Sequence, residues 1–162
     1  MNRLLMFTFA LMGIGFLAQA SDPSVPSVDS SQELRTKLES LPEEFVLLQI
    51  WNPLCIPCGE EVDVLNETIK TVSSNQRRLH VLATPIQARS KDIASFVDHF
   101  HPSYDQWYPK HDFKAFLALQ HSVPWVLLFD KKRNLVKQWL GKLATSEILH
   151  EINSGKPSRS NN

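Results

Sequence analysis

The chain has 162 residues, 43% of them hydrophobic, and its 17 lysines and arginines balance its 17 aspartates and glutamates. This length is enough for one domain with a hydrophobic core of its own. The balanced charge argues against a nucleic-acid-binding protein, which needs a basic patch or stripe. The nearest candidate, Arg77-Arg78 before an apolar run, is typical of a solvated strand edge, so we expect no nucleic-acid partner.

The first twenty residues have the pattern of a signal peptide. Arg3 supplies a short positive region, residues 4–17 are uncharged and largely apolar, and Ala18-Gln19-Ala20 places small residues where signal peptidase needs them. The apolar run is shorter than the roughly 20 residues of a spanning helix, which favours a cleaved signal over an uncleaved membrane anchor. We therefore expect residues 1–20 to be removed and the mature protein to lie in a bacterial periplasm.

Composition divides the remaining chain into three parts. Residues 21–30 are rich in Ser, Pro and Asp and predict a flexible lead-in. Residues 31–154 carry the periodic apolar pattern of one folded domain. The polar residues 155–162 predict a disordered tail.

In chain order, the domain is expected to begin with a helix over 31–41, with Ser30 or Ser31 as its N-cap and Pro42 as its end. The nearly continuous apolar run Phe45–Trp51 then predicts a strand buried on both faces. The expected elements after it are a helix from the cysteines to residue 73, a strand at 79–83 stopped by Thr84-Pro85, a helix at 90–100, a loop or short strand at 103–112, a short helix at 113–120, strands at 125–130 and 135–140 joined by a turn, and a helix at 145–153.

This order alternates strands with helices and ends in an antiparallel hairpin. Strands that alternate with helices pair in parallel, whereas a two-strand hairpin is antiparallel. The sequence therefore predicts an α/β fold, a three-layer α/β/α sandwich with a mixed central sheet.

The only two cysteines, Cys55 and Cys58, lie between the buried strand and the following helix. At a helix N-terminus the unpaired N–H groups and the dipole stabilise a thiolate, so we expect the pKa of Cys55 to be lowered. Cys58 follows one turn later and further inside, where it can resolve a mixed disulfide formed at Cys55. Pro57 fits the first turn because its missing N–H costs little there. This arrangement favours redox exchange.

Three other uses of the cysteine pair remain open. A permanent disulfide across so short a loop would stabilise the fold only weakly. A zinc site would need further ligands, but a copper-binding chaperone or assembly factor could add one histidine such as His121. His99 and His101 lie on nearly opposite sides of a predicted helix and are poor co-ligands. A redox-inactive binding module is disfavoured because both cysteines are intact.

The segment "FVLLQIWNPLCIPCGEEVDVL" resembles the active-site segment of the thioredoxin superfamily, and it is most similar to the exported TlpA/ResA/DsbE group. The residues that match that group's pattern are Trp51, Cys55, Pro57, Cys58 and Glu61. Further along, Val123-Pro124 resembles the cis-proline that precedes the family's third long strand. The resemblance extends over about residues 31–153 and implies a thioredoxin-like fold.

The resemblance also implies roles for these residues. Cys55 would be the exposed nucleophile and Cys58 the resolving thiol. Pro124, if cis, would leave the Val123 backbone free to pair with a substrate strand. Glu61 would tune a thiol pKa or relay a proton, unless it is a solvated acid at the start of the helix.

Other positions of the site follow from the same resemblance. Gln49 stands where cytoplasmic thioredoxins carry a buried aspartate, which leaves Glu61 as the nearest candidate carboxylate. Trp51 and Pro57 are expected beside the substrate, with core packing as the alternative for Trp51. Trp125 is expected to act in specificity or, alternatively, to pack in the core.

The activity implied by the resemblance is thiol–disulfide exchange, with no cofactor and no metal. Reduction of protein disulfides is favoured over oxidation or isomerisation, because Ile56-Pro57 lacks the histidine of strongly oxidising members. The expected partners are a membrane electron donor of the DsbD type and client proteins with cysteines or disulfides. Apocytochrome c is one candidate client.

Overall fold

The computed structural model describes residues 31–120 and 122–154. The predicted signal peptide, lead-in and tail lie outside these residues, as does His121. Within the described ranges, no helix is both long and apolar enough to cross a membrane.

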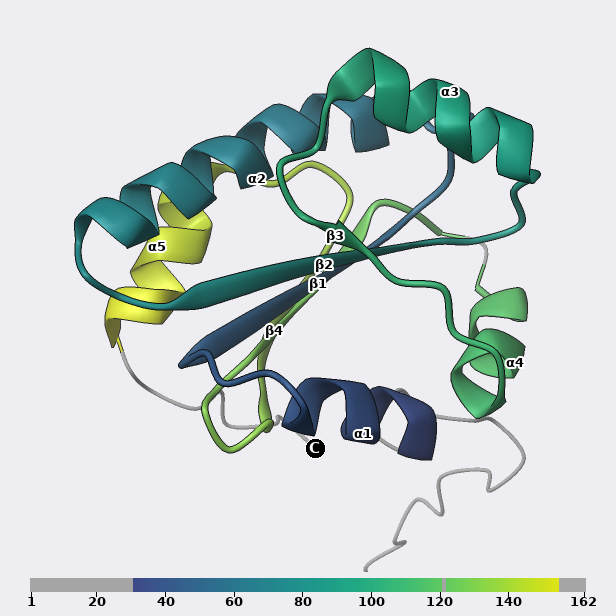
Figure 1. The fold of residues 1–162 in the computed structure, drawn as a ribbon. Coiled ribbons are helices and arrows are strands. Elements are labelled where there is room, and N and C mark those ends of the chain that lie inside the picture. Colours follow the sequence, from purple (N-terminus) through teal and green to yellow (C-terminus); the bar gives the residue numbers. More distant parts are fainter. Residues whose placement is uncertain (1–30, 121, 155–162) are drawn as a thin grey trace, which may run out of the picture.

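A five-stranded mixed sheet forms the middle of the domain (Figure 1). Its strands are β1 (Phe45–Trp51), β2 (Leu79–Pro85), β3 (Asp105–Gln106), β4 (Trp125–Phe129) and β5 (Leu135–Leu140). The spatial order is β3-β2-β1-β4-β5. The central strand β1 pairs in parallel with β2 and antiparallel with β4. The short β3 extends the parallel side, and the hairpin partner β5 extends the antiparallel side.

Helices cover both faces of the sheet, which confirms the predicted three-layer sandwich (Figure 1). One face carries α1 (Gln32–Glu39) and α4 (Asp112–Ala118), and the other carries α2 (Ile56–Ser74), α3 (Ser90–Phe100) and α5 (Thr145–Ser154). All seven residues of β1 are buried, as expected for a strand covered on both sides.

The predicted element boundaries hold closely, with one informative error. Ser31 is the N-cap of α1, and its hydroxyl oxygen accepts a hydrogen bond from the Leu34 N–H at 3.1 Å. Strand β2 does not stop before Thr84-Pro85, because Pro85 still pairs with Trp51. The Trp51 carbonyl accepts a hydrogen bond from the Ile86 N–H at 2.8 Å. The pairing of β1 with β2 therefore does not need the N–H that Pro85 lacks.

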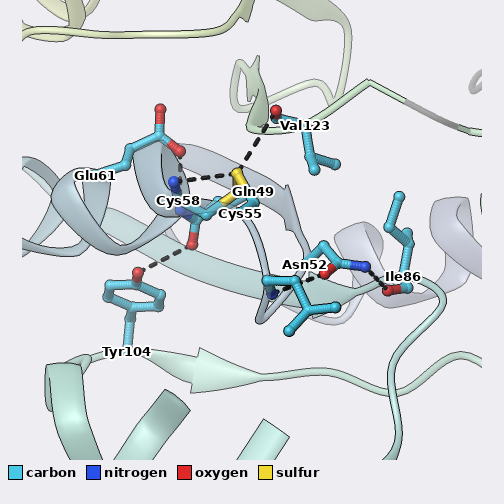
Figure 2. Close-up of a disulfide and its surroundings, with 9 residues drawn as sticks. Gln49, Asn52, Cys55, Cys58, Glu61, Ile86, Tyr104 and Val123 are labelled. Atoms are coloured by element: carbon cyan, nitrogen blue, oxygen red, sulfur yellow. Dashed lines mark hydrogen bonds between the residues drawn. A yellow bond between two sulfur atoms is a disulfide. The ribbon is translucent and has the colours of Figure 1, made fainter. Parts of the chain in front are cut away.

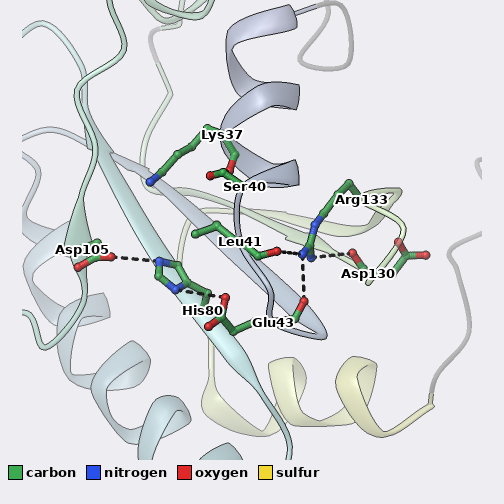
Figure 3. Close-up of polar contacts among 8 residues, drawn as sticks. All are labelled: Lys37, Ser40, Leu41, Glu43, His80, Asp105, Asp130 and Arg133. Atoms are coloured by element: carbon green, nitrogen blue, oxygen red, sulfur yellow. Dashed lines mark hydrogen bonds and ion pairs between the residues drawn. The ribbon is translucent and has the colours of Figure 1, made fainter.

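Arg133 connects the β4–β5 turn to the segment between α1 and β1 through hydrogen bonds (Figure 3). These segments lie at the end of the sheet opposite the cysteines. Its guanidinium donates hydrogen bonds to the backbone carbonyls of Leu41 and, at 3.0 Å, Glu43. It also bonds the Asp130 carbonyl of its own turn at 3.2 Å. One side chain therefore joins two connections that are distant in the sequence.

In the same region His80 links two strands (Figure 3). Its imidazole lies 3.7 Å from a Glu43 carboxylate oxygen and 3.2 Å from one of Asp105. Because Asp105 belongs to the two-residue strand β3, this contact lies between the edge strand and its neighbour β2.

The Arg133 contacts predict a stability effect. The Arg133→Met variant should lower the free energy of unfolding by about 2 kcal/mol, because hydrogen bonds from a charged donor contribute about 1.5–3 kcal/mol. Urea denaturation measures the change. Lys132→Met, at an exposed neighbour in the same turn, is the matched control and should have almost no effect. Equal losses in the two variants would contradict this role for Arg133.

Candidate active site

The two cysteines occupy the start of α2, directly beyond the end of β1. They form a disulfide in this structure, with Cα atoms 5.3 Å apart. Cys55 is the N-cap of α2, and the Cys58 N–H lies 3.2 Å from its sulfur. Cys58 is fully buried, whereas Cys55 is partly exposed. A partner approaching from solvent therefore reaches Cys55 first.

Asn52 holds the loop that carries Cys55 (Figure 2). Its side-chain oxygen accepts a hydrogen bond from the Leu54 N–H at 2.8 Å, and its side-chain nitrogen donates to the Ile86 carbonyl at 3.0 Å. The Asn52 carbonyl accepts from the Cys55 N–H at 3.0 Å. Our sequence analysis missed this residue, although an asparagine before a proline at a strand end is a turn signal.

The Val123–Pro124 peptide bond is cis, which meets the condition set by the sequence. The antiparallel pairing of β1 and β4 places Ile50 opposite Trp125, so the chain before β4 meets the loop after β1. As a result the Val123 carbonyl oxygen lies 3.6 Å from the Cys55 sulfur (Figure 2). Pro124 is buried, and its carbonyl accepts a hydrogen bond from the Gly141 N–H at 2.9 Å.

Glu61 is buried behind the cysteines, with only 3% of its surface exposed. This burial excludes the solvated acid that the sequence left open. One carboxylate oxygen accepts a hydrogen bond from the Gln49 side-chain nitrogen at 2.8 Å, and the Tyr104 hydroxyl donates to the Gln49 oxygen at 3.0 Å (Figure 2). The other oxygen of Glu61 is buried without a hydrogen-bond partner.

Burial governs the protonation of this group. It raises the pKa of Glu61 to about 7, although the hydrogen bond from Gln49 opposes the rise. Burial and the nearby charge of Glu61 also raise the pKa of Tyr104 above its usual range. Tyr104 was missed from the sequence because it lies in a segment without helix or strand periodicity.

The two tryptophans predicted near the site are both in the central sheet, but their side chains pack in different clusters. Trp51 is buried in the cluster around Cys58 and stacks on Phe96, with ring centroids 4.1 Å apart. Trp125 instead packs against the core cluster beneath α1 and α4, where the centroid of its ring lies 5.9 Å from that of the Phe116 ring. The structure therefore gives packing partners to both residues.

Gly59, next to Cys58, lies close to α3, which the sequence did not reveal. A Cβ atom at this position would lie 2.3 Å from the Phe100 ring, which belongs to α3. A larger residue at position 59 would therefore have to displace the Phe100 ring.

The surface around Cys55 is apolar. Leu54 and Ile56 are 84% and 80% exposed, while Pro57 is exposed in the first turn of α2. Large apolar side chains that flank a partly exposed sulfur suit contact with another protein.

No metal centre is evident in the part of the chain that the structure describes. Among those residues, no group of three or more His, Cys, Asp or Glu side chains is placed to hold a metal ion. His121, the ligand suggested for a copper-binding alternative, lies outside the described residues.

The chain was compared with protein families, curated proteins and solved structures. Neither protein-family models nor curated proteins gave a match. Solved structures did, among them a thiol:disulfide interchange protein DsbE from Chlorobium tepidum, with 18% identity, TM-score 0.61, and coverage of 72% of this chain and 83% of that one. A DsbF homologue from Corynebacterium diphtheriae has 23% identity and TM-score 0.59, with coverage of 72% and 75%.

A third neighbour is a secreted Mycobacterium tuberculosis disulfide oxidoreductase homologous to Escherichia coli DsbE. It has 13% identity and TM-score 0.58, with coverage of 72% of this chain and 85% of that one. Likeness at these identities concerns the fold. The chain therefore has the thioredoxin-like fold of these thiol–disulfide oxidoreductases and carries a Cys-x-x-Cys pair at the start of α2.

Proposed function

We propose that this chain is an exported thiol–disulfide oxidoreductase that exchanges disulfides with client proteins through Cys55 and Cys58. The observation that carries the proposal is the asymmetry of the pair: Cys55 is partly exposed at a helix N-cap, and Cys58 is fully buried behind it. The structural neighbours named above support the same chemistry, and one of them is described as secreted.

In the reducing direction the cycle begins with both cysteines as thiols. The Cys55 thiolate attacks one sulfur of a client disulfide, forms a mixed disulfide and releases the other client sulfur as a thiolate, which takes up a proton. The Cys58 thiol then loses its proton and attacks the Cys55 sulfur. This closes the disulfide seen here and releases the second client sulfur as a thiolate, which also takes up a proton. In total, two electrons pass to the client, its two sulfurs take up two protons, and the two cysteines give up two protons.

Glu61 is proposed to accept the proton that Cys58 loses. The two residues lie three positions apart on α2 and so share one side of the helix. A carboxyl group whose pKa is raised to about 7 exchanges protons efficiently near neutral pH. Gln49 and Tyr104 are positioning residues, because their hydrogen bonds hold the carboxylate in place.

The Val123 segment is proposed to bind the client strand. Its carbonyl lies 3.6 Å from the Cys55 sulfur, so a client cysteine that reaches Cys55 also passes along this backbone. Pro124 shapes the segment, and Pro57 with Leu54 and Ile56 forms the neighbouring apolar surface.

We propose that the protein reduces the disulfides of its clients and that it does so in the periplasm. Each round of reduction oxidises Cys55 and Cys58, so a dithiol protein must reduce them again, for which we propose a membrane protein of the DsbD type. The Ile56-Pro57 dipeptide supports the direction, because it lacks the histidine of strongly oxidising members. The predicted signal peptide supports the location, and apocytochrome c remains a candidate client.

The cysteines predict an asymmetric pair of variants. Cys55→Ala should abolish the reduction of insulin disulfides, because no exposed nucleophile remains. Cys58→Ala should retain the first attack and accumulate mixed disulfides with substrate, visible on non-reducing gels. Full insulin reduction by both variants would remove the basis for the proposed enzyme.

The redox potential tests the direction. Equilibration of the Cys55–Cys58 pair with glutathione or dithiothreitol, followed by quantification of both forms, should give a potential well below the value of about −120 mV found for the most oxidising members. A value near that limit would show that the protein oxidises its clients.

The buried carboxyl predicts how stability changes with pH while the disulfide is intact. Unfolded protein releases the Glu61 proton near the ordinary pKa of 4.5, whereas folded protein holds it to about 7. The stability contributed by the protonated group is therefore complete below pH 4.5 and is lost as pH rises to about 7. The loss should be about 3 kcal/mol, because each unit of pKa difference corresponds to about 1.4 kcal/mol.

Urea denaturation from about pH 4.5 to 8 measures this dependence. The Glu61→Gln variant should remove most of the slope, and Glu60→Gln, at the exposed neighbour, is the matched control and should keep it. An unchanged slope in Glu61→Gln would mean that Glu61 does not titrate as described.

A further inference from the structure

A pocket lies at the end of the sheet opposite the cysteines. Its volume is about 560 Å³, which is within the range of small-molecule sites. The start of β1, the chain before β2, the β4–β5 turn and α5 contribute to its walls. Neither cysteine lines the pocket, nor does any residue of the apolar surface around Cys55. The length of β1 separates Phe45 at the pocket from Trp51 ahead of the cysteine loop, a distance of about 20 Å.

The inner part of the pocket is apolar. Phe45 and Val136 line it, and they are 6% and 2% exposed. Both side chains belong to the core cluster between the sheet and the helices α2 and α5, so they are held in place from behind. The Arg77 guanidinium lies over the Phe45 ring, with its central carbon 5.9 Å from the ring centroid. An apolar group that enters the pocket therefore meets an apolar surface built into the core.

The three carboxylates in the lining already have partners. Glu44 forms an ion pair with the Arg77 guanidinium at 3.5 Å. The carboxylate of Asp130 accepts two hydrogen bonds from within the β4–β5 turn, at 2.9 and 3.1 Å. Glu151 lies 3.8 Å from the Lys137 ammonium group. The acidic groups are therefore engaged by donors of the protein itself.

Three cations in the lining are not engaged in this way. The side chains of Arg78, Lys131 and Lys132 are exposed and have no hydrogen-bond or ion-pair partner among the described residues. Arg78 belongs to the chain before β2, whereas the two lysines belong to the β4–β5 turn. The free positive charges therefore come from two separate walls of the pocket. A negatively charged group placed between them is attracted by both.

We propose that this pocket binds a small anion that carries an apolar ring or chain. The anionic group lies between Arg78 and the two lysines of the turn, and the apolar part rests on Phe45 and Val136. Binding is non-covalent, and because the pocket is distant from Cys55 it leaves disulfide exchange unchanged. The proposal is therefore independent of the proposed function.

The test separates the contributions of charge and apolar surface with three probes. Phenyl phosphate has both features, inorganic phosphate has only the charge, and benzyl alcohol has only the ring. Titration of the protein, followed by the NMR signals of its backbone amides, should show shifts at Phe45, Arg78 and Asn134 with phenyl phosphate. Its dissociation constant should be about 1 mM or lower, as expected for a ligand of this size. The other two probes should bind at least about tenfold more weakly, because each lacks one of the two contacts.

A pair of double variants tests the cations. Arg78→Glu with Lys132→Glu should weaken the binding of phenyl phosphate at least about tenfold, because two attractive charges become repulsive. The matched control is Lys91→Glu with Lys114→Glu, which changes the net charge equally at exposed positions of α3 and α4 outside the pocket. The control should change the dissociation constant less than about twofold, because exposed charges at a distance are screened. Both double variants should reduce insulin at the rate of the unmodified protein, which also shows that they are folded.

Several results would overturn the pocket. Equal weakening in the two double variants would mean that only the overall charge attracts the anion. Binding of benzyl alcohol or inorganic phosphate as tight as that of phenyl phosphate would remove one of the two proposed contacts. Shifts confined to Leu54 and Ile56, or no shift with any probe, would show that the ligand does not bind here. Weakening confined to the variant in the pocket, with insulin reduction intact, supports the proposal.

Discussion

The antiparallel pairing of β1 with β4 is the contact on which the site depends. It places the end of β1 beside the beginning of β4. As a result, the Cys55 sulfur lies 3.6 Å from the carbonyl oxygen of Val123, which is 68 positions away in the chain. All residues of β1 are buried between helices on both faces, which fixes the register of that pairing. The reactive loop therefore follows directly from a strand that is buried along its whole length.

The same sheet places a carboxyl group in an environment that suits proton transfer. Gln49 on β1, Glu61 on α2 and Tyr104 ahead of β3 come together only because β3, β2 and β1 are neighbours. Burial raises the pKa of Glu61 towards neutrality at a cost in stability, and one of its oxygens remains unpaired. Such costs are typical of functional sites, where groups are held in states that the fold alone would not favour.

Much of this arrangement could be predicted from local pattern. The apolar run at Phe45–Trp51 predicted the bounds of β1, and the position of Cys55 after it indicated a helix N-terminus. Val123-Pro124 before the next apolar strand pointed to the second wall of the site. These features depend on residues close in sequence, or on a resemblance carried by short motifs.

The features that escaped prediction depend on packing between distant elements. Gly59 lies against the Phe100 ring of α3, and Tyr104 joins the site from a segment without periodicity. The burial of Glu61 depends on Gln49, on another element, so spacing along α2 could not distinguish it from a solvated acid. For Trp125 the sequence left specificity and core packing open, and only the structure shows that its ring packs against the core cluster on the α1 and α4 face. Single-sequence pattern contains none of these contacts.

The central claim is that the cysteine pair is asymmetric, with Cys55 as the attacking thiol and Cys58 sheltered behind it. The most direct measurement is alkylation of the reduced, folded protein with substoichiometric iodoacetamide, followed by peptide mass spectrometry. The account predicts that nearly all of the label is on Cys55. Equal labelling of the two cysteines, or preferential labelling of Cys58, would contradict it.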